Sequence, residues 1–295
     1  MKVRILGSGT PAPSLRRQGS GYAVQIAEDL LVFDHGPGAH GRFLEAGLRA
    51  RDVSHLFLTH YHYDHILDVP RLALTRWDHG PPDQAPLKVF GPSPLDDILD
   101  GFFGSGGAFG PDIHARTHSP ASQSVFEVRG GNGPRPGPCF DSRQVSPGDV
   151  IEGRGWQVSV GPTQHVQPTL DCIAYRIEAD DEVLVYSGDT GGVFAPFIDF
   201  AKGADVLILM NHFLSGQEAS PEYRIMSGSH MDNAEVAQRA GAGMLVLTHL
   251  QPDLDRPSVQ ERMVAEMAHI YQGPIIVGED LMDVPMRPPV MTTAD

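Results

Sequence analysis

Residues 56–65 read Leu-Phe-Leu-Thr-His-Tyr-His-Tyr-Asp-His. The apolar half of this stretch is typical of a buried strand, and the polar half places four potential metal ligands in one loop: His60, His62, Asp64 and His65. Imidazole and carboxylate side chains are ligands that zinc, manganese and iron all accept. The stretch therefore predicts a metal site at the end of a strand. A polar surface turn is the alternative, and the density of ligands argues against it.

Three further potential ligands also follow apolar runs of the strand type: His165, Asp189 and His249. The carboxyl ends of neighbouring strands meet at one edge of a sheet, so we expect these side chains to converge on one site. Three or four ligands satisfy one zinc ion, whereas the combined set is large enough for two ions that share a carboxylate and a bridging water. The sequence therefore predicts a dinuclear centre with two Zn²⁺ ions, and Mn²⁺ or iron are the alternative metals.

Apolar runs and turn signals alternate along the chain in a way that indicates an α/β fold. The first 69 residues predict a strand, a glycine turn, two strands, a helix, a strand and a helix. Residues 22–26 and 30–34 are expected to form a hairpin, and residues 39–48 have helical spacing. Further strands are predicted over residues 155–161, 173–177, 183–187, 205–210 and 244–248, and helices over 232–239 and 258–271.

Residues 79–147 differ from the rest of the chain because they are rich in glycine and proline. This composition predicts an insertion without a core of its own, which serves as a lid, as a binding loop or merely as a surface excursion. A homodimer formed through this insertion is a further hypothesis, based on analogy between folds.

Composition limits the classes of protein to which the chain can belong. Its 295 residues, 41% hydrophobic and 20% charged, are typical of a soluble globular protein. No apolar stretch approaches the roughly 20 residues of a membrane span, and the N-terminus runs into a strand pattern without a signal peptide. We therefore expect a cytoplasmic protein with no membrane partner. Cys139 and Cys172 are far apart and in no Cys-x-x-Cys pair, which predicts reduced, structural thiols.

The formal net charge of −15 at pH 7 bears on the choice of partner. A surface this acidic repels phosphate backbones unless a local basic patch overrides the repulsion. Pairs of basic residues such as Arg16-Arg17 are typical of ordinary solvated surface. The charge therefore disfavours nucleic acid.

The order of the ligand motifs resembles that of the metallo-β-lactamase superfamily. The resemblance spans nearly the whole chain and rests on residues 60–65, the lone His165, the run Ser187-Gly188-Asp189-Thr190 and the strand-terminal Thr248-His249. It implies a four-layer αββα sandwich that forms a single domain over residues 1–295. It also implies the ligand sets, which are His60, His62, His165 and Asp189 around one metal and Asp64, His65, Asp189 and His249 around the other. Asp189 would bridge the two metals.

Two more motifs resemble the ribonuclease Z-like branch of this superfamily, which also includes arylsulfatases and phosphodiesterases. They are the opening run Leu6-Gly7-Ser8-Gly9-Thr10-Pro11 and the segment Ser227-Gly228-Ser229-His230. The resemblance implies that Asp34 supports the metal loop without binding metal itself. It also implies that His230 is an additional catalytic histidine, which stabilises an oxyanion or protonates the leaving group. A surface histidine beside a helix is the alternative for His230.

The chain departs from the tRNA-processing members of this branch in two respects. Their strand corresponding to residues 205–210 ends in a His-Glu pair whose Glu contacts the additional histidine, whereas this chain reads Leu209-Met210-Asn211-His212-Phe213. The sequence also lacks the long glycine- and lysine-rich arm with which those enzymes hold tRNA. Together with the acidic charge, these departures favour a small-molecule substrate over nucleic acid. His212 has three roles open to it: partner of His230, metal ligand, or cap of a strand in a polar pocket.

The sequence as a whole predicts a metal-dependent hydrolase. A metal-bound hydroxide would attack a small-molecule ester such as an aryl sulfate, a phosphodiester or a lactone, or would carry out a hydrolytic dehalogenation. Asp64 would orient the hydroxide, and His230, helped by His212, would assist the leaving group. The alternatives are a tRNA 3′-end endoribonuclease or another phosphodiesterase acting on nucleic acid, and, from a different class, a non-catalytic metal-binding sensor protein.

Overall fold

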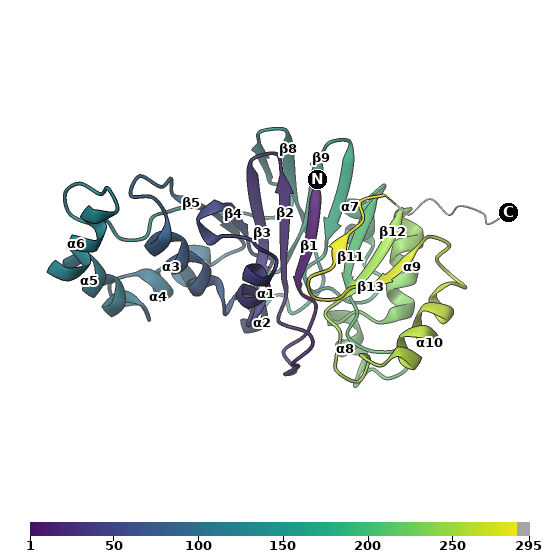
Figure 1. Ribbon diagram of the computed structural model, residues 1–295. Helices are drawn as coiled ribbons and strands as arrows, with labels where there is room; N and C mark the ends of the chain where they lie inside the picture. The colour runs from purple at the N-terminus through teal and green to yellow at the C-terminus, as the bar shows by residue number, and fades with distance from the viewer. Residues whose placement is uncertain (288–295) are drawn as a thin grey trace.

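Two β-sheets lie face to face in the computed structural model, and helices cover the outer side of each (Figure 1). The structure describes residues 1–287. Each sheet has seven strands. The arrangement is the four-layer αββα sandwich that the family resemblance implies. Sheets covered on both faces require strands that are apolar on both sides, which explains the continuous apolar runs in the sequence.

The first sheet is built mainly from the N-terminal half of the chain, with strand order β14-β1-β2-β3-β4-β5-β6. β3 to β6 pair in parallel, whereas β14, β1, β2 and β3 pair antiparallel. Its strands are β1 Lys2–Gly7, β2 Gly21–Ile26, β3 Asp29–His35, β4 Val53–Phe57, β5 Leu87–Gly91, β6 Phe140–Gln144 and β14 Asp283–Val284.

The second sheet has the strand order β13-β12-β11-β10-β9-β8-β7. β10 to β13 pair in parallel, and β7 to β10 pair antiparallel. Its strands are β7 Val150–Gly153, β8 Trp156–Pro162, β9 Ile173–Ala179, β10 Glu182–Tyr186, β11 Val206–Met210, β12 Met244–Thr248 and β13 Ile275–Val277.

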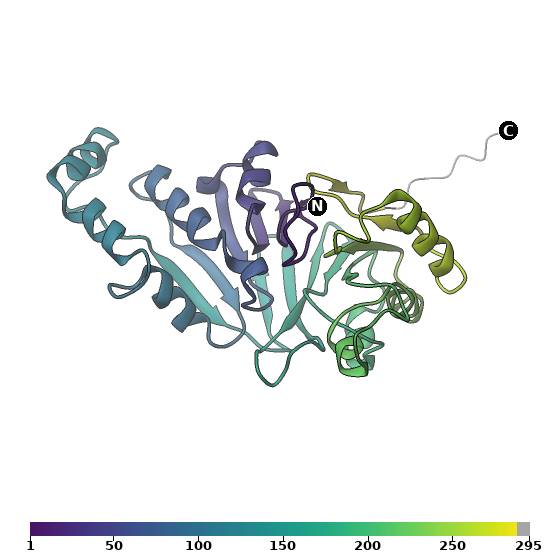
Figure 2. The same ribbon diagram turned by 90° about the horizontal axis from the view of Figure 1, so that it is seen from below.

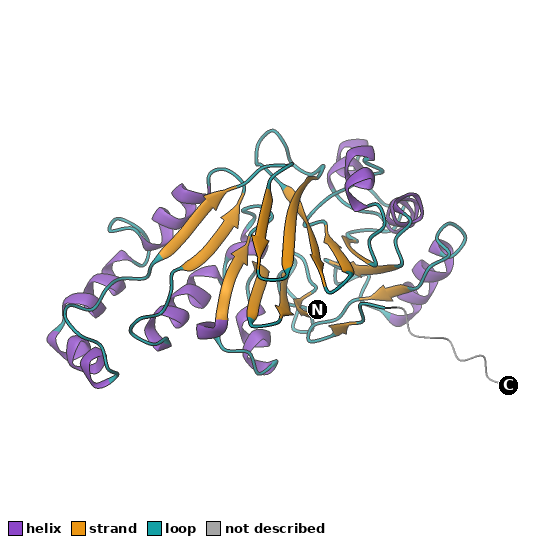
Figure 3. Ribbon diagram, turned by 90° about the horizontal axis from the view of Figure 1, so that it is seen from above, coloured by secondary structure: helices purple, strands orange, loops and turns teal. Residues whose placement is uncertain are grey.

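The helices form the two outer layers, seen from below and from above in Figures 2 and 3. Helices α1 to α4 pack on the first sheet, and α7, α9 and α10 pack on the second. Among the described residues, no helix is long and apolar enough to cross a membrane. The helices are α1 Ala39–Glu45, α2 Tyr63–Ile66, α3 Val69–His79, α4 Leu95–Phe103, α5 Gly110–His118, α6 Pro120–Val128, α7 Ala195–Ala201, α8 Pro221–Met226, α9 His230–Ala240 and α10 Pro257–Met267, with a 3₁₀ turn at Ala50–Asp52.

Strand β11 illustrates how the layers are held together. Val206 and Ile208 point into the core between the two sheets, whereas Leu207 and Leu209 pack against the helical layer. Side chains alternate between the two faces of a strand, so one apolar run supplies both cores. Hydrophobic burial on both faces holds the strand in place and so fixes the position of its ends. The candidate site lies at these strand ends.

Three predicted helices have different boundaries in the structure, and the one expected over residues 258–271 spans Pro257–Met267. The helix expected over residues 39–48 ends at Glu45, because the chain turns through Gly47 with a positive φ of 74°. The helix expected over residues 232–239 begins earlier, at His230. Ser229 is its N-cap, and the Ser229 hydroxyl accepts a hydrogen bond from the backbone N–H of Asp232 at 3.3 Å.

The segment 79–147 is more ordered than its glycine and proline content indicates. It contributes β5 and β6 to the first sheet and also contains three helices, of which α4 packs on that sheet. Only α5 and α6, residues 110–128, project beyond the sandwich (Figures 1 and 3). We call these two helices the helical arm. The prediction of an irregular insertion over the whole of residues 79–147 was therefore wrong, because short strands paired at the edge of a sheet tolerate flanking glycine and proline.

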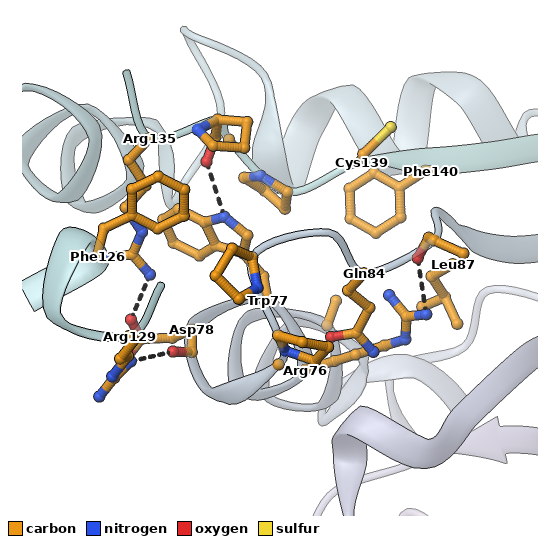
Figure 4. A pocket seen from close by; sticks show the side chains of 18 residues that line it. Arg76, Trp77, Asp78, Gln84, Leu87, Phe126, Arg129, Arg135, Cys139 and Phe140 are labelled. Atoms are coloured by element: carbon orange, nitrogen blue, oxygen red, sulfur yellow. Dashed lines mark hydrogen bonds and ion pairs between the residues drawn. The ribbon is translucent and has the colours of Figure 1, made fainter. Parts of the chain in front are cut away.

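Asp78, at the end of α3, ties the arm to the body of the protein (Figure 4). Its carboxylate accepts hydrogen bonds from Arg135 at 2.6 Å and Arg116 at 3.1 Å, and its backbone carbonyl accepts one from Arg129 at 2.6 Å. Arg135 also lies over the ring of Trp77, 4.5 Å from its centre. These contacts line a cavity of about 100 Å³ between α3 and the arm, which shares no residue with the predicted metal ligands.

We expect Asp78→Ala to loosen the arm while the sandwich stays folded. The change leaves Arg135, which is buried, without its carboxylate partner and should cost the local structure about 1–2 kcal/mol. Hydrogen exchange of residues 110–128 should therefore become about tenfold faster. Asp112→Ala is the matched control, since among the described residues Asp112 pairs with Arg116 alone. Equal exchange rates in the two variants would contradict the role of Asp78.

His55 gives the inter-sheet core a dependence on pH. Its ring lies edge-on against Trp156, with ring centres 4.9 Å apart, and burial lowers its pKa to about 4. The unfolded chain, with a His pKa near 6.5, binds this proton more readily than the folded chain. Stability from His55 is thus full above about pH 6.5 and is lost as the pH falls toward 4. Urea unfolding at pH 7.5 and 5 should show a smaller loss of stability in His55→Gln than in the unsubstituted protein, and an equal loss would refute this account.

Candidate metal centre

The seven predicted metal ligands lie together at the strand ends. They form two groups, in each of which the ligand atoms lie within 4.8 Å of one another: His60, His62, His165 and Asp189 in the first, and Asp64, His65 and His249 in the second. All are buried except His62, which is half-buried. The loop after β4 supplies His60 and His62, helix α2 supplies Asp64 and His65, and the others follow β8, β10 and β12. Convergence at strand ends is thus how the fold assembles the cluster.

Asp189 faces both groups. Its Oδ1 lies 3.3 Å from His65 Nε2, and its Oδ2 lies 3.3 Å from His249 Nε2, both in the second group. The same Oδ2 lies 3.7 Å from His165 Nε2 and 3.9 Å from His60 Nε2, both in the first group. A carboxylate in this position can contact a cation in each group at once.

The side chains of the cluster match the requirements of bound cations. Asp64 Oδ1 and His65 Nε2 are buried and have no hydrogen-bond partner among the described residues. Buried polar atoms are almost always paired, so these two atoms are free to act as ligands of a cation. In the first group, His62 Nδ1 lies 3.1 Å from His60 Nε2 and 3.3 Å from His165 Nε2. Three ring nitrogens that converge in this way suit a metal of the zinc type.

Asp34 lies beneath the metal loop, where it accepts several hydrogen bonds. Its carboxylate accepts from the backbone N–H and hydroxyl of Thr59, both at 2.8 Å, and from Tyr186 at 2.7 Å. It also lies 2.8 Å from His65 Nδ1. A proton held at Nδ1 by this carboxylate leaves His65 Nε2 free to face the cluster, so Asp34 orients His65 without reaching the cluster itself.

The charges of the cluster are strongly coupled. Burial opposes ionisation of Asp189, but His249 and His65 outweigh burial and hold the pKa of that carboxyl well below its usual range. Burial likewise opposes a charge on His65, and the carboxylates of Asp189, Asp64 and Asp34 nevertheless raise its pKa well above 6.5. Carboxylates placed in this way attract positive charge, which a bound metal cation would supply.

His230, the first residue of α9, is buried and turned toward α10. Its Nδ1 accepts a hydrogen bond from the backbone N–H of Ser215 at 3.0 Å, and its Nε2 lies 2.7 Å from Glu266 Oε2. The proton therefore resides on Nε2, where Glu266 accepts it. Sequence reasoning missed Glu266, which lies 36 positions along the chain, because no local pattern links two helices packed side by side.

His212 follows β11 and lies against His249. The Nδ1 atoms of the two rings are 3.3 Å apart, and His212 Nε2 lies 2.5 Å from the side-chain amide of Gln251. Among the described residues His212 forms no hydrogen bond to His230, so of its three predicted roles the partnership with His230 was wrong. Gln251 was also missed by sequence reasoning, because it follows a strand-terminal histidine without forming any recognisable motif.

Comparison with known proteins identifies the family. A family model described as a beta-lactamase superfamily domain matches residues 31–250. The chain belongs to the metallo-β-lactamase superfamily. A relative named Ribonuclease Z, from Mycobacterium sp. (strain KMS), is 32% identical over 297 residues, which cover 98% of each chain. The predicted ribonuclease Z-like branch and the prediction of a hydrolytic enzyme are thus confirmed.

Solved structures of the family have the same fold. The metallo-beta-lactamase fold protein YhfI from Bacillus subtilis aligns with a TM-score of 0.73 at 20% identity, covering 96% of this chain and 98% of its own. Human tRNase Z, short form, aligns with a TM-score of 0.68 at 18% identity, covering 98% of this chain and all of its own. These likenesses support the sandwich architecture over nearly the full length of the chain.

The predicted partner was wrong. The sequence favoured a small-molecule substrate and disfavoured nucleic acid, whereas the relative with 32% identity is named a ribonuclease. Net charge was a poor guide to the substrate because it sums the charges of the whole surface, whereas a phosphate is bound at one place. Where metal cations bind, they dominate the charge of the site. The absence of the His-Glu pair was also a poor argument against an RNA substrate, because Glu266 on α10 contacts His230 instead.

Proposed function

We propose that the protein is a metal-dependent phosphodiesterase that cleaves RNA at or near the 3′ end of a tRNA. Two features support this proposal. The first is the 32% sequence identity to a Ribonuclease Z, in an alignment that covers 98% of the chain. The second, which carries most weight, is the pair of adjacent ligand groups that face each other across Asp189. Two cations placed about 3.5–4 Å apart are a recurring arrangement in enzymes that hydrolyse phosphodiesters.

We further propose that the two groups bind Zn²⁺, one ion each, with Asp189 shared. When bound, the metals would supply Lewis acidity that activates water and neutralises charge on the phosphate. The donor set fits this role, because imidazole and carboxylate suit zinc and the cluster contains unpaired buried atoms of both kinds.

The remaining chemistry falls to side chains of the chain itself. Asp64 Oδ1 is buried and unpaired among the described residues, so it can accept a hydrogen bond from the attacking water and hold it in line with the phosphorus. His230 carries its proton on Nε2, beside Glu266, and this is the proton proposed to reach the leaving oxygen. Asp34 keeps the Nδ1 proton of His65 in place throughout.

A tRNA transcript with a 3′ extension is the substrate that tests the proposal. The zinc-loaded protein should cut this transcript at one position near the 3′ end of the tRNA body and should leave a mature transcript intact. Sequencing of the product ends locates the cut. Cleavage should also weaken as salt rises, because phosphate contacts release counterions. Absence of cleavage at low salt, with two zinc ions bound, would refute the RNA substrate.

A further inference from the structure

We propose that His212 is a positioning residue, which holds His249 in the tautomer that binds metal. The inference rests on the proposed function, specifically on His249 as a ligand of the second group. The two rings are joined Nδ1 to Nδ1 at 3.3 Å, and their planes are tilted by 35° with centres 5.3 Å apart. His249 presents its other nitrogen to the cluster, 3.1 Å from Asp64 Oδ2 and 3.3 Å from Asp189 Oδ2.

The position of the protons follows from this geometry. A neutral imidazole that gives a lone pair at Nε2 to a cation must carry its proton on Nδ1. The Nδ1 atom of His249 faces one hydrogen-bonding atom among the described residues, and that atom is His212 Nδ1. His212 must therefore accept at Nδ1 and carry its own proton at Nε2. The Gln251 amide lies 2.5 Å from that Nε2, and its oxygen can accept the proton when the amide turns about its last bond.

The other buried histidines of the cluster are held in an equivalent way by different acceptors. His65 Nδ1 faces the Asp34 carboxylate, and His60 Nδ1 lies 3.0 Å from the Thr59 hydroxyl. His165 Nδ1 faces the backbone carbonyl of Met226. Ligating histidines almost always donate their second N–H to such a group, and removal of the acceptor weakens metal binding. At His249 the acceptor is a second imidazole, which gives the histidine that follows β11 a role.

The surroundings of His212 fix its ring in this position. Its backbone N–H donates to the Gly228 carbonyl at 2.7 Å, and Tyr223 of α8 packs edge-on against the ring with centres 5.9 Å apart. The His212 nitrogens face His249 Nδ1 and Gln251, whereas the Asp64 and Asp189 carboxylates lie on the Nε2 side of His249. The contact thus places His212 behind His249, and not among the metal ligands.

Two substitutions of His212 separate a positioning role from a merely structural one. His212→Leu removes the acceptor, whereas His212→Asn restores a side-chain oxygen near the former Nδ1. Zn²⁺ affinity is measured by competition with a chromophoric chelator. We expect two zinc ions in the unsubstituted protein, with one of them bound about 10–100-fold more weakly in His212→Leu and restored largely by His212→Asn. His79→Leu, at an exposed histidine, is the matched control and should bind zinc normally.

Nuclear magnetic resonance of the unsubstituted protein provides a test that needs no variant. Long-range ¹H–¹⁵N spectra of the zinc-loaded protein should show His249 protonated at Nδ1 and His212 at Nε2. Two tightly bound zinc ions in His212→Leu, or a His249 proton on Nε2, would overturn the positioning role alone. A His249→Ala variant that binds zinc like the unsubstituted protein would overturn the proposed ligand role of His249, and this inference with it.

Discussion

Replacement of Asp189 by alanine is expected to abolish RNA cleavage. Among the described residues, Asp189 is the one carboxylate that lies within 4 Å of histidines in both ligand groups, so its loss would remove a ligand from each of the two proposed metals. Metal catalysis lowers the reaction barrier by several kcal/mol. Its removal should therefore lower kcat/KM by about 10³-fold or more. Single-turnover cleavage of the 3′-extended transcript measures this loss.

The comparison requires that the variant remain folded. Asp199→Ala is the matched control, because the Asp199 carboxylate is exposed on α7 and pairs with Lys202 alone among the described residues. Its activity should equal that of the unsubstituted protein. Circular dichroism should show both variants folded, since Asp189 belongs to none of the hydrophobic cores that hold the sheets together. Full activity in Asp189→Ala would contradict the assignment of the centre.

Replacement of His230 by alanine should slow RNA cleavage by about 10²- to 10⁴-fold, the usual contribution of a general acid. The leaving oxygen of RNA is a poor leaving group and needs a proton, whereas p-nitrophenolate departs without one. The same variant should therefore hydrolyse bis(p-nitrophenyl) phosphate at nearly the unsubstituted rate. The ratio of the two rates, measured on one preparation, isolates proton donation from any loss of metal.

His269→Ala is the control for this experiment, since His269 is exposed beyond α10. Glu266→Gln should lower RNA cleavage less than His230→Ala, because the amide oxygen still accepts the Nε2 proton but no longer stabilises a charged ring. Equal losses on both substrates in His230→Ala would show that His230 maintains the structure of the site and does not donate a proton.

The ligand cluster was predictable from the sequence because its information is local. Residues 60–65 form one short stretch that runs from the loop after β4 into α2, and the other predicted ligands each follow a strand recognisable as an apolar run. Parallel strands bring such ends to one edge, so their convergence follows from topology. The contacts of His212 with His249 and of His230 with Glu266 were not predictable, because they join segments 37 and 36 positions apart through the packing of neighbouring elements.

The segment 79–147 shows the opposite limitation. Strand β5 is five residues long and β6 is polar, so neither has a run that stands out from its glycine- and proline-rich surroundings. Their pairing with β4 and with each other makes them strands, and pairing is a property of the folded chain. The substrate was mispredicted for a related reason, since net charge does not record which groups surround the cluster.

Metal titration of RNA cleavage tests the central claim most directly. Protein freed of metal by a chelator is titrated with Zn²⁺ from zero to three equivalents, and cleavage of the 3′-extended tRNA transcript is followed at each step. We predict no cleavage without metal and a rise that levels off at about two equivalents, as expected for a two-metal centre. Cleavage that persists without metal, or none at any zinc content, would contradict the proposal of a zinc-dependent ribonuclease.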